Sequence, residues 1–245
     1  MKEIILNIEY GGLGDNLFYS PIPYLIKKKS PHTKVYIYNS PNIRSKDISN
    51  LIWKNNPYID GFTQKKGKPI NVKLDNNSNK NIISQIADNY LDVEDPNLEP
   101  VIYFNLEYLE ELSDKTLVDL NYVSFIGAVS RNKIEKYLSK FENLLFINKP
   151  KWINDKGDNY SPNNLLSYAN AINSCRNFIC FTSGGATLAA AIKKKANCIY
   201  GFGQNKIFHH SKIHDYIELS PNSTSLKYYL YFILKSKNKL KLLWR

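Results

Sequence analysis

The sequence contains two apolar segments that each run directly into a glycine-rich turn and then into helical sequence. The first leads from residues 4–8 into Gly11-Gly12-Leu13-Gly14-Asp15, and the second leads from residues 178–181 into Thr182-Ser183-Gly184-Gly185. Glycine adopts backbone angles that other residues resist, so such turns suit the sharp passage from a strand to a helix. A strand–turn–helix unit in each half of the chain is typical of α/β proteins with parallel sheets.

Further apolar runs and helical patterns alternate along the chain. Strands are expected at residues 3–9, 35–38, 101–104, 122–126, 144–147, 178–181, 198–200 and 216–219. Helices are expected at 16–29, where Pro21 and Pro23 predict a kink, and at 81–91, 107–112, 132–141, 161–175 with Ser161 as N-cap, 184–194 and 223–235. Because parallel strands need crossover connections, we predict two Rossmann-like lobes that face a cleft.

The boundary between the two lobes is expected near residue 115. On this division, residues 1–114 form the N-terminal lobe and residues 115–222 form the C-terminal lobe. A closing helix and a basic tail then occupy residues 223–245. By length alone, a chain of 245 residues suits either one large domain or two small ones, since a domain usually contains roughly 100–200 residues.

The formal net charge of +11 indicates anionic partners, such as nucleotide phosphates or an acidic membrane surface. The lysines are spread along the whole sequence, so we do not expect nucleic acid to be the partner. The N-terminus lacks a signal-peptide pattern, and no apolar run approaches the roughly 18 residues of a membrane span. We therefore expect a cytoplasmic protein whose basic tail allows peripheral contact with the inner face of the cytoplasmic membrane.

The sequence shows no pattern for a metal site. Its three cysteines, Cys175, Cys180 and Cys198, have neither the spacing of a disulfide framework nor that of zinc ligands, and we expect them to be buried core residues. No Asp-x-Asp motif is present. We therefore expect chemistry without a metal ion.

The first glycine turn fits neither of the two common phosphate-binding motifs. Gly11-Gly12-Leu13-Gly14-Asp15 differs from both G-x-G-x-x-G and G-x-x-x-x-G-K-[ST]. Asp15 at the start of a helix would repel a phosphate, and a carboxylate there suits the removal of a proton from a hydroxyl group. The alternative is that Asp15 only caps the helix through backbone N–H groups. Both interpretations remain open from the sequence.

The second glycine turn is the better candidate for an anion site. The N–H groups and hydroxyls of Thr182-Ser183-Gly184-Gly185 lie at a helix start, where a diphosphate can bind. A diphosphate leaving group also needs positive charge, for which Arg131 is the favoured residue and Lys133 is a neighbour. The alternatives are a plain tight turn at 182–185 and a solvated charge at Arg131.

The two turns carry a resemblance to one enzyme family. Residues 11–28, GGLGDNLFYSPIPYLIKK, resemble the motif G-D-x-[LV]-x-x-[ST]-P-x-[LI]-x-x-[LI]-[KR] of glycosyltransferase family 9, the ADP-heptose:lipopolysaccharide heptosyltransferase-like enzymes of the GT-B superfamily. Residues 177–203 are similar to that family's signature D-[ST]-G-[PL]-x-H-[LI]-A-[AS]-A-x-x-x-P-x-[VI]-x-[LI]-[FY]-G. Ser183, Gly184, Leu188 and Gly201 match it, whereas Thr182 replaces Asp, Thr187 replaces His and Asn197 replaces Pro.

The resemblance implies a compact GT-B-like fold and an inverting, metal-independent transfer of a sugar from a nucleotide diphosphate to a glycan acceptor. It implies Asp15 as the base, no cofactor beyond the donor substrate, and a product such as lipopolysaccharide, lipooligosaccharide or capsule. The expected substrate-binding residues are Gly11, Gly12, Gly14 and Asn16 at the first turn, and Arg131, Lys133, Thr182, Ser183, Gly184, Gly185, Thr187, Lys206, His209 and His210 in the C-terminal lobe.

Three other functions remain open from the sequence. The replacements at Thr182 and Thr187 leave room for a non-catalytic relative that binds a sugar nucleotide or a glycan. The opening of family 11 fucosyltransferases, G-G-L-G-N-Q-[LM]-F, also resembles residues 11–18, although Asp15-Asn16 departs from it. A Rossmann oxidoreductase is disfavoured because G-x-G-x-x-G is absent and no acidic ribose ligand follows Tyr38.

Overall fold

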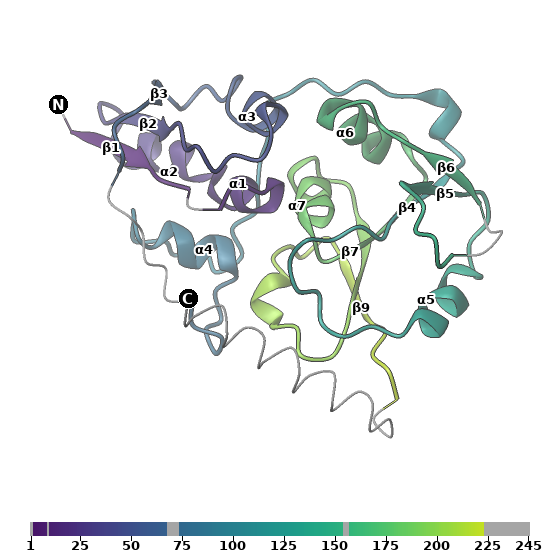
Figure 1. Ribbon diagram of the computed structural model, residues 1–245. Coiled ribbons are helices and arrows are strands. Elements are labelled where there is room, and N and C mark those ends of the chain that lie inside the picture. Colours follow the sequence, from purple (N-terminus) through teal and green to yellow (C-terminus); the bar gives the residue numbers. More distant parts are fainter. Residues whose placement is uncertain (1, 9, 68–73, 154–156, 223–245) are drawn as a thin grey trace.

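The computed structural model describes residues 2–8, 10–67, 74–153 and 157–222, and these contain two parallel sheets (Figure 1). The smaller sheet has the order β1 (Glu3–Leu6), β2 (Lys34–Tyr38), β3 (Gly61–Thr63). The larger sheet has the order β6 (Asp158–Tyr160), β5 (Leu144–Ile147), β4 (Thr116–Asp119), β7 (Asn177–Phe181), β8 (Ala196–Tyr200), β9 (Asp215–Glu218). The expected α/β fold with parallel sheets is confirmed.

The larger sheet has the strand order of a doubly wound dinucleotide-binding domain. Numbered within the lobe, its strands follow the order 3-2-1-4-5-6, so the winding reverses between β4 and β7. Ligands of such sheets bind in the crevice outside the carboxyl ends of the strands, at the point of reversal. The second glycine turn follows β7 directly and therefore lies at this point.

Helices pack against both sheets, and in the larger lobe they lie on both faces of the sheet. In the smaller lobe these are α1 (Leu13–Tyr19), α2 (Ile22–Lys29), α3 (Lys46–Ile52) and α4 (Ile82–Ala87). In the larger lobe, α6 (Leu165–Ser174) and α7 (Gly184–Ala191) share a core with Leu117 and Phe178 of the sheet. The opposite face of that sheet packs Val118 and Phe146 against α5 (Arg131–Leu138). Two short 3-10 helices, η1 (Glu110–Leu112) and η2 (Lys206–Phe208), complete the described elements.

One hydrophobic core runs through both lobes. Leu6 and Ile37 of the smaller sheet belong to the same buried cluster as Phe178 of β7 and Ala189 of α7. Figure 1 shows α1 and α7 side by side at the centre of the molecule, with the smaller lobe on one side and the larger sheet on the other. The expected division at residue 115 falls between η1 and β4, and the expected closing helix and tail at 223–245 lie outside the described residues.

Several expected elements differ from the observed ones. The helix at 16–29 is two helices, because Pro21 and Pro23 fall at the start of α2 and cannot donate backbone hydrogen bonds inside a longer helix. Residues 101–104 are not a strand, and the Val101 N–H group donates to the Ser20 hydroxyl oxygen at 2.8 Å instead of to a sheet. Asn164, whose side chain accepts from Ser167 N–H, caps α6 in place of Ser161.

The expected strand at 122–126 is also wrong. The strand is β4, and it ends in a turn in which the Asn121 N–H group donates to Asp119 Oδ1 at 3.0 Å. Tyr122 and Val123 after this turn are exposed, so their apolar character does not mark a buried strand. The three cysteines are buried and free, as expected, and Cys180 and Cys198 sit opposite each other in β7 and β8. Within the described residues, none of the helices is both long enough and apolar enough to cross a bilayer.

Candidate functional site

The two glycine turns meet at one joint between the lobes. A Cβ atom on Gly14 would lie 3.4 Å from the Cα atom of Gly184, and a Cβ on Gly184 would lie 3.1 Å from Leu13 Cβ. The N-terminal ends of α1 and α7 therefore approach each other closely, and Gly184 is the glycine whose Cβ would be crowded at this contact. The structure brings the first expected motif directly against the second, although 169 other residues separate Gly14 from Gly184 in the sequence.

Hydrogen bonds from buried polar side chains hold the first glycine turn in place. Asn16 is fully buried, its Oδ1 accepts from Trp53 Nε1 at 3.0 Å, and its Nδ2 donates to the Gly12 carbonyl oxygen at 2.9 Å. A Cβ on Gly11 would overlap the carbonyl oxygen of Asn42, so the neighbouring loop also fixes this turn. Gly11, Gly12 and Asn16, which we expected to bind substrate, thus build the frame of the turn.

Asp15 both caps α1 and keeps a basic carboxylate at the joint. Gly12 is the N-cap of α1, and Asp15 Oδ2 accepts from the Gly12 N–H group at 3.2 Å, so Asp15 caps the helix from its third position and is not itself the N-cap. Burial raises the pKa of the Asp15 carboxyl above its usual range, against the opposing effects of the Gly12 N–H group and the Arg44 charge. A raised pKa makes a carboxylate a stronger base, so capping and proton removal are compatible in this geometry.

Arg44 is a neighbour of this turn that sequence reasoning missed. Its N–H group donates to the Gly11 carbonyl oxygen at 3.1 Å, and its guanidinium Nη1 lies 3.7 Å from the position that a Cβ on Gly12 would take. The side chain is exposed and its charge acts on Asp15. A single arginine in a polar loop carries no motif, so only the fold reveals that it lies beside the carboxylate.

The second turn rests on a buried pair formed by Tyr168 and Asp119. The Tyr168 hydroxyl of α6 donates to Asp119 Oδ2 at the end of β4, at 2.5 Å. A Cβ on Gly185 would overlap that hydroxyl and lie 3.2 Å from Asp119 Oδ2. Burial, followed by the nearby carboxylate of Asp119, raises the pKa of Tyr168 well above its usual value, so its hydroxyl stays protonated as a donor. Gly185 is therefore required by close approach.

The hydroxyl groups of the second turn have different surroundings. Thr187, one turn into α7, is buried, and its Oγ1 donates to the Ser183 carbonyl oxygen at 3.3 Å. Thr182 Oγ1 accepts from Gln204 Nε2 at 2.5 Å. Ser183 Oγ is enclosed, makes no capping bond to α7, and has no hydrogen-bond partner among the described residues. The Ser183 hydroxyl at the start of α7 thus lacks a partner among the described residues, whereas the Thr187 hydroxyl is bonded to the backbone.

The histidines of the segment after β8 are packed among aromatic rings. His209 stacks on Tyr216 with ring centroids 4.2 Å apart, and His210 meets Phe18 of α1 edge to face at 5.4 Å. Burial lowers the pKa of both histidines to about 4, with Lys206 adding to the effect at His209. Both rings are therefore neutral near pH 7, and any phosphate contact would use an uncharged ring. Lys206 itself is exposed in η2.

The expected cations at the start of α5 lie against a different partner. The Arg131 guanidinium is 5.4 Å from the centroid of the Trp152 ring, over its face. Ser130 caps α5 by accepting from the Lys133 N–H group at 3.4 Å. α5 packs on the face of the larger sheet away from α6 and α7. Among the described residues, Arg131 therefore contacts Trp152 and has no contact with the second glycine turn.

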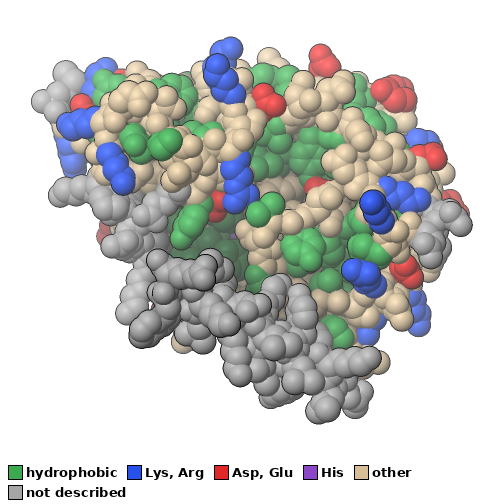
Figure 2. Space-filling model, viewed as in Figure 1, with side chains coloured by type: hydrophobic (Ala, Val, Ile, Leu, Met, Phe, Trp, Pro, Cys, Tyr) green, Lys and Arg blue, Asp and Glu red, His purple; other side chains and the backbone are tan. Residues whose placement is uncertain are grey.

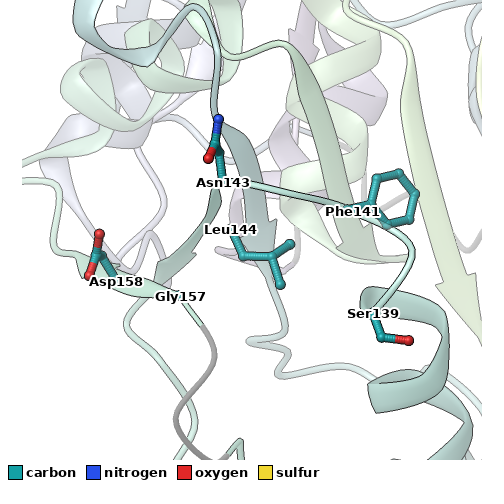
Figure 3. A pocket seen from close by; sticks show the side chains of 6 residues that line it. All are labelled: Ser139, Phe141, Asn143, Leu144, Gly157 and Asp158. Atoms are coloured by element: carbon teal, nitrogen blue, oxygen red, sulfur yellow. The ribbon is translucent and has the colours of Figure 1, made fainter.

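A hollow of about 410 Å³ lies elsewhere, at the opposite edge of the larger sheet. Leu144 begins β5 and Asp158 begins β6, so the hollow faces the amino ends of these strands. Its lining side chains are spread around the opening and do not converge on one point (Figure 3). Within the described residues, no three His, Cys, Asp or Glu side chains are grouped so that they could hold a metal ion.

The visible face of the molecule carries its positive charge in scattered positions. Figure 2 shows lysine and arginine side chains around the rim, separated by apolar and neutral groups. The same view shows a hollow with apolar side chains between the smaller lobe and the rest of the molecule. The positive side chains that are visible on this face are thus scattered and do not form one basic patch.

The chain matches known proteins in its fold and not in its sequence. No family model and no curated protein matches the sequence. A family 9 glycosyl transferase from Veillonella parvula matches the structure with a TM-score of 0.60 and 16% identity, over 97% of this chain and 89% of that chain. The ADP-heptose LPS heptosyltransferase II of E. coli matches with a TM-score of 0.58 and 10% identity, over 89% and 90% of the two chains.

A third match is the E. coli heptosyltransferase WaaC with ADP, with a TM-score of 0.55 and 11% identity, over 97% of this chain and 100% of that chain. This is the fold of the family 9 glycosyltransferases. The expected GT-B-like architecture is thereby confirmed. At these identities the likeness is one of fold alone.

Proposed function

We propose that this chain is a glycosyltransferase that moves a sugar from a nucleotide diphosphate to the hydroxyl group of a glycan acceptor. The observation that supports this proposal is the contact of Gly14, the residue before Asp15, with Gly184 at the start of α7, which follows the strand at the reversal point of the larger sheet. The family 9 fold supports the reaction class. Two of the structural neighbours are an ADP-heptose LPS heptosyltransferase and a heptosyltransferase with ADP, which supports a nucleotide sugar as the donor.

The donor is proposed to bind on the larger lobe. The first N–H groups of α7 have no partner within the helix, and they carry the positive end of the helix dipole. Ser183 Oγ lies at the same place without a partner among the described residues. These groups suit the oxygen atoms of a diphosphate, and they stabilise the negative charge that develops when the diphosphate leaves.

The acceptor is proposed to approach from the smaller lobe. Its hydroxyl oxygen attacks the anomeric carbon, the bond from that carbon to the diphosphate oxygen breaks, and Asp15 takes the hydroxyl proton. Attack from the side opposite the leaving group inverts the anomeric carbon. The reaction needs no metal in this scheme, because the helix start stabilises the leaving group. The proposed product is a glycan of the lipopolysaccharide, lipooligosaccharide or capsule type, which is what the sequence resemblance implies.

A non-catalytic relative that binds nucleotide sugars is the second candidate. It is favoured by the two threonines of the second turn, because Thr182 and Thr187 both form hydrogen bonds within the protein. The two candidates share the donor site and differ only in the transfer step. A measurement of transfer therefore separates them where a measurement of binding does not.

The test combines a binding panel with one isosteric variant. Calorimetry with ADP-, UDP- and GDP-sugars is expected to find one donor that binds, and that donor is then offered with candidate glycan acceptors. Asp15→Asn keeps an oxygen for the Gly12 N–H group but removes the base, so we expect retained folding and donor binding with transfer reduced about a thousandfold. Asp47→Asn at the start of α3 is the matched control and is expected to keep full transfer. Undiminished transfer by Asp15→Asn would eliminate Asp15 as the base.

A further inference from the structure

Gln204 reaches the second glycine turn from a neighbouring strand. It follows β8, two residues after a bridge in which Ala128 and Phe202 pair antiparallel, and its N–H group donates to the Gly201 carbonyl oxygen at 3.3 Å. Its side-chain Nε2 then donates to Thr182 Oγ1 at 2.5 Å. Backbone and side-chain contacts thus hold the amide of Gln204 against the turn, although no motif in the sequence points to this residue.

Two polar atoms at this turn lack hydrogen-bond partners. Gln204 Oε1 and Ser183 Oγ are both enclosed, and neither has a partner within the described parts of the chain. Native proteins pair roughly 90% or more of their buried polar groups, so unpaired groups need an explanation. Thr182 links the two residues, because it directly precedes Ser183 in the chain and its Oγ1 accepts from Gln204 Nε2. A polar ligand at the carboxyl edge of the sheet would account for two unpaired oxygens that belong to the same turn and to the residue bonded to it.

The unpaired amide oxygen of Gln204 restricts which groups of a ligand can bind to it. An amide oxygen accepts hydrogen bonds and donates none. A fully ionised diphosphate has no hydrogen to donate, whereas a sugar hydroxyl does. We propose that Gln204, positioned by Thr182, accepts a hydrogen bond from a hydroxyl group of the sugar in the donor. This inference rests on the proposed function, and it makes Gln204 a specificity-determining residue for the sugar while Ser183 and the α7 N–H groups bind the diphosphate.

The experiment compares the affinity for a nucleotide sugar with that for its parent nucleotide. The probe is whichever of ADP-glucose, UDP-glucose, UDP-N-acetylglucosamine and GDP-mannose binds the wild-type protein most tightly, together with the matching nucleoside diphosphate. We expect Gln204→Ala to weaken the nucleotide sugar about fivefold and to leave the diphosphate within twofold, since one neutral hydrogen bond is lost. Gln204→Met, which keeps the side-chain length, is expected to give the same ratio and guards against a folding defect.

Thr182→Val tests the positioning step. It removes the hydroxyl that holds Gln204 Nε2 while keeping the shape of the side chain, so we expect the same selective loss, smaller in size. In Gln204→Ala/Thr182→Val the two losses are expected not to add, because Thr182 acts through Gln204. Lys212→Ala is the control in the same segment, since its side chain is exposed, and it is expected to leave the affinity ratio unchanged.

The outcomes separate the two proposals. Equal weakening of nucleotide sugar and diphosphate would overturn the inference, because Gln204 would then act on the phosphates or on the turn as a whole. No weakening of either ligand would overturn it as well. In both cases the proposed function stands, since the wild type binds its donor. A wild-type protein that binds no nucleotide and no nucleotide sugar would instead overturn the proposed function.

Discussion

Gly14 of α1 and Gly184 of α7 touch across the joint of the two lobes, but the space around them is unequal. A Cβ on Gly14 would find its nearest atom at 3.4 Å, an ordinary van der Waals contact. A Cβ on Gly184 would lie 3.1 Å from Leu13 Cβ and 3.2 Å from the Gly14 nitrogen, which is crowding against backbone. The close contact of α1 with α7 therefore depends on Gly184 more than on Gly14.

Gly184→Ala is expected to force α1 and α7 apart by a few tenths of an ångström. The cost of such overpacking is about 1–2 kcal/mol of unfolding free energy. The shift also moves the helix start that is proposed to bind the diphosphate, so we expect nucleotide affinity to fall. Gly14→Ala is the matched control, with unchanged or slightly raised stability because alanine favours helix. Chemical denaturation and calorimetry check both; equal effects of the two variants would contradict the unequal geometry.

The two turns were predictable from sequence because local rules decide them. An apolar strand followed by glycines and helical sequence has few other structures open to it, and both turns form as expected. The apolar run at residues 122–126 predicts a buried strand, and the prediction is wrong because Tyr122 and Val123 are exposed. The strand ends before them at the Asp119–Asn121 turn, and a single Asp and Asn give only a weak turn signal.

The supporting residues of the site could not be predicted in the same way. Tyr168 reaches the turn from α6, Arg44 from the loop before α3, and Gln204 from the segment after β8. None lies at a fixed sequence distance from a glycine turn, because tertiary packing brings them there. The sequence likewise predicts substrate-binding roles for His209 and His210, and only the fold shows that burial among aromatic rings keeps both side chains neutral.

Gly185→Ala is expected to damage the second turn through one particular atom. The new methyl group would overlap the Tyr168 hydroxyl, so the turn must move away from Asp119 and Tyr168. We expect nucleotide affinity to fall about tenfold. The double variant Gly185→Ala/Tyr168→Phe removes the obstructing oxygen and is expected to recover part of this affinity, although Tyr168→Phe alone weakens the support of Asp119. A double-mutant cycle by calorimetry measures the coupling, and strict additivity would show that the hydroxyl is not the obstacle.

Arg44→Gln is expected to change the pH dependence of transfer. Asp15 must be ionised to act as base, so kcat/KM falls as the pH drops through its raised pKa. The Arg44 charge lowers that pKa, and its removal raises the pKa further. The acid limb of the profile is therefore expected to move to higher pH. Lys46→Gln, two residues along at the start of α3, is the control for lost surface charge. An acid limb that stays in place would show that Arg44 does not act on the base.

Acid is expected to destabilise the protein through its buried histidines. The pKa of His209 and His210 is about 4 in the folded protein, because burial opposes their charged forms, against an ordinary value of 6.5. Between these values the unfolded chain binds more protons, so the free energy of unfolding is fully present above pH 6.5 and decreases as the pH falls toward 4. For His210, which is almost fully buried, the loss amounts to about 3 kcal/mol.

His209→Phe tests the origin of this acid sensitivity. Phenylalanine can stack on Tyr216 as the imidazole does and cannot be protonated, so we expect near wild-type stability at pH 7.5 and a shallower decline between pH 6.5 and 4. Substitution of the exposed His32 by Asn is expected to leave the decline unchanged. Urea unfolding at a series of pH values measures both. An identical decline in His209→Phe and in the wild type would place the acid sensitivity in titrating groups other than His209.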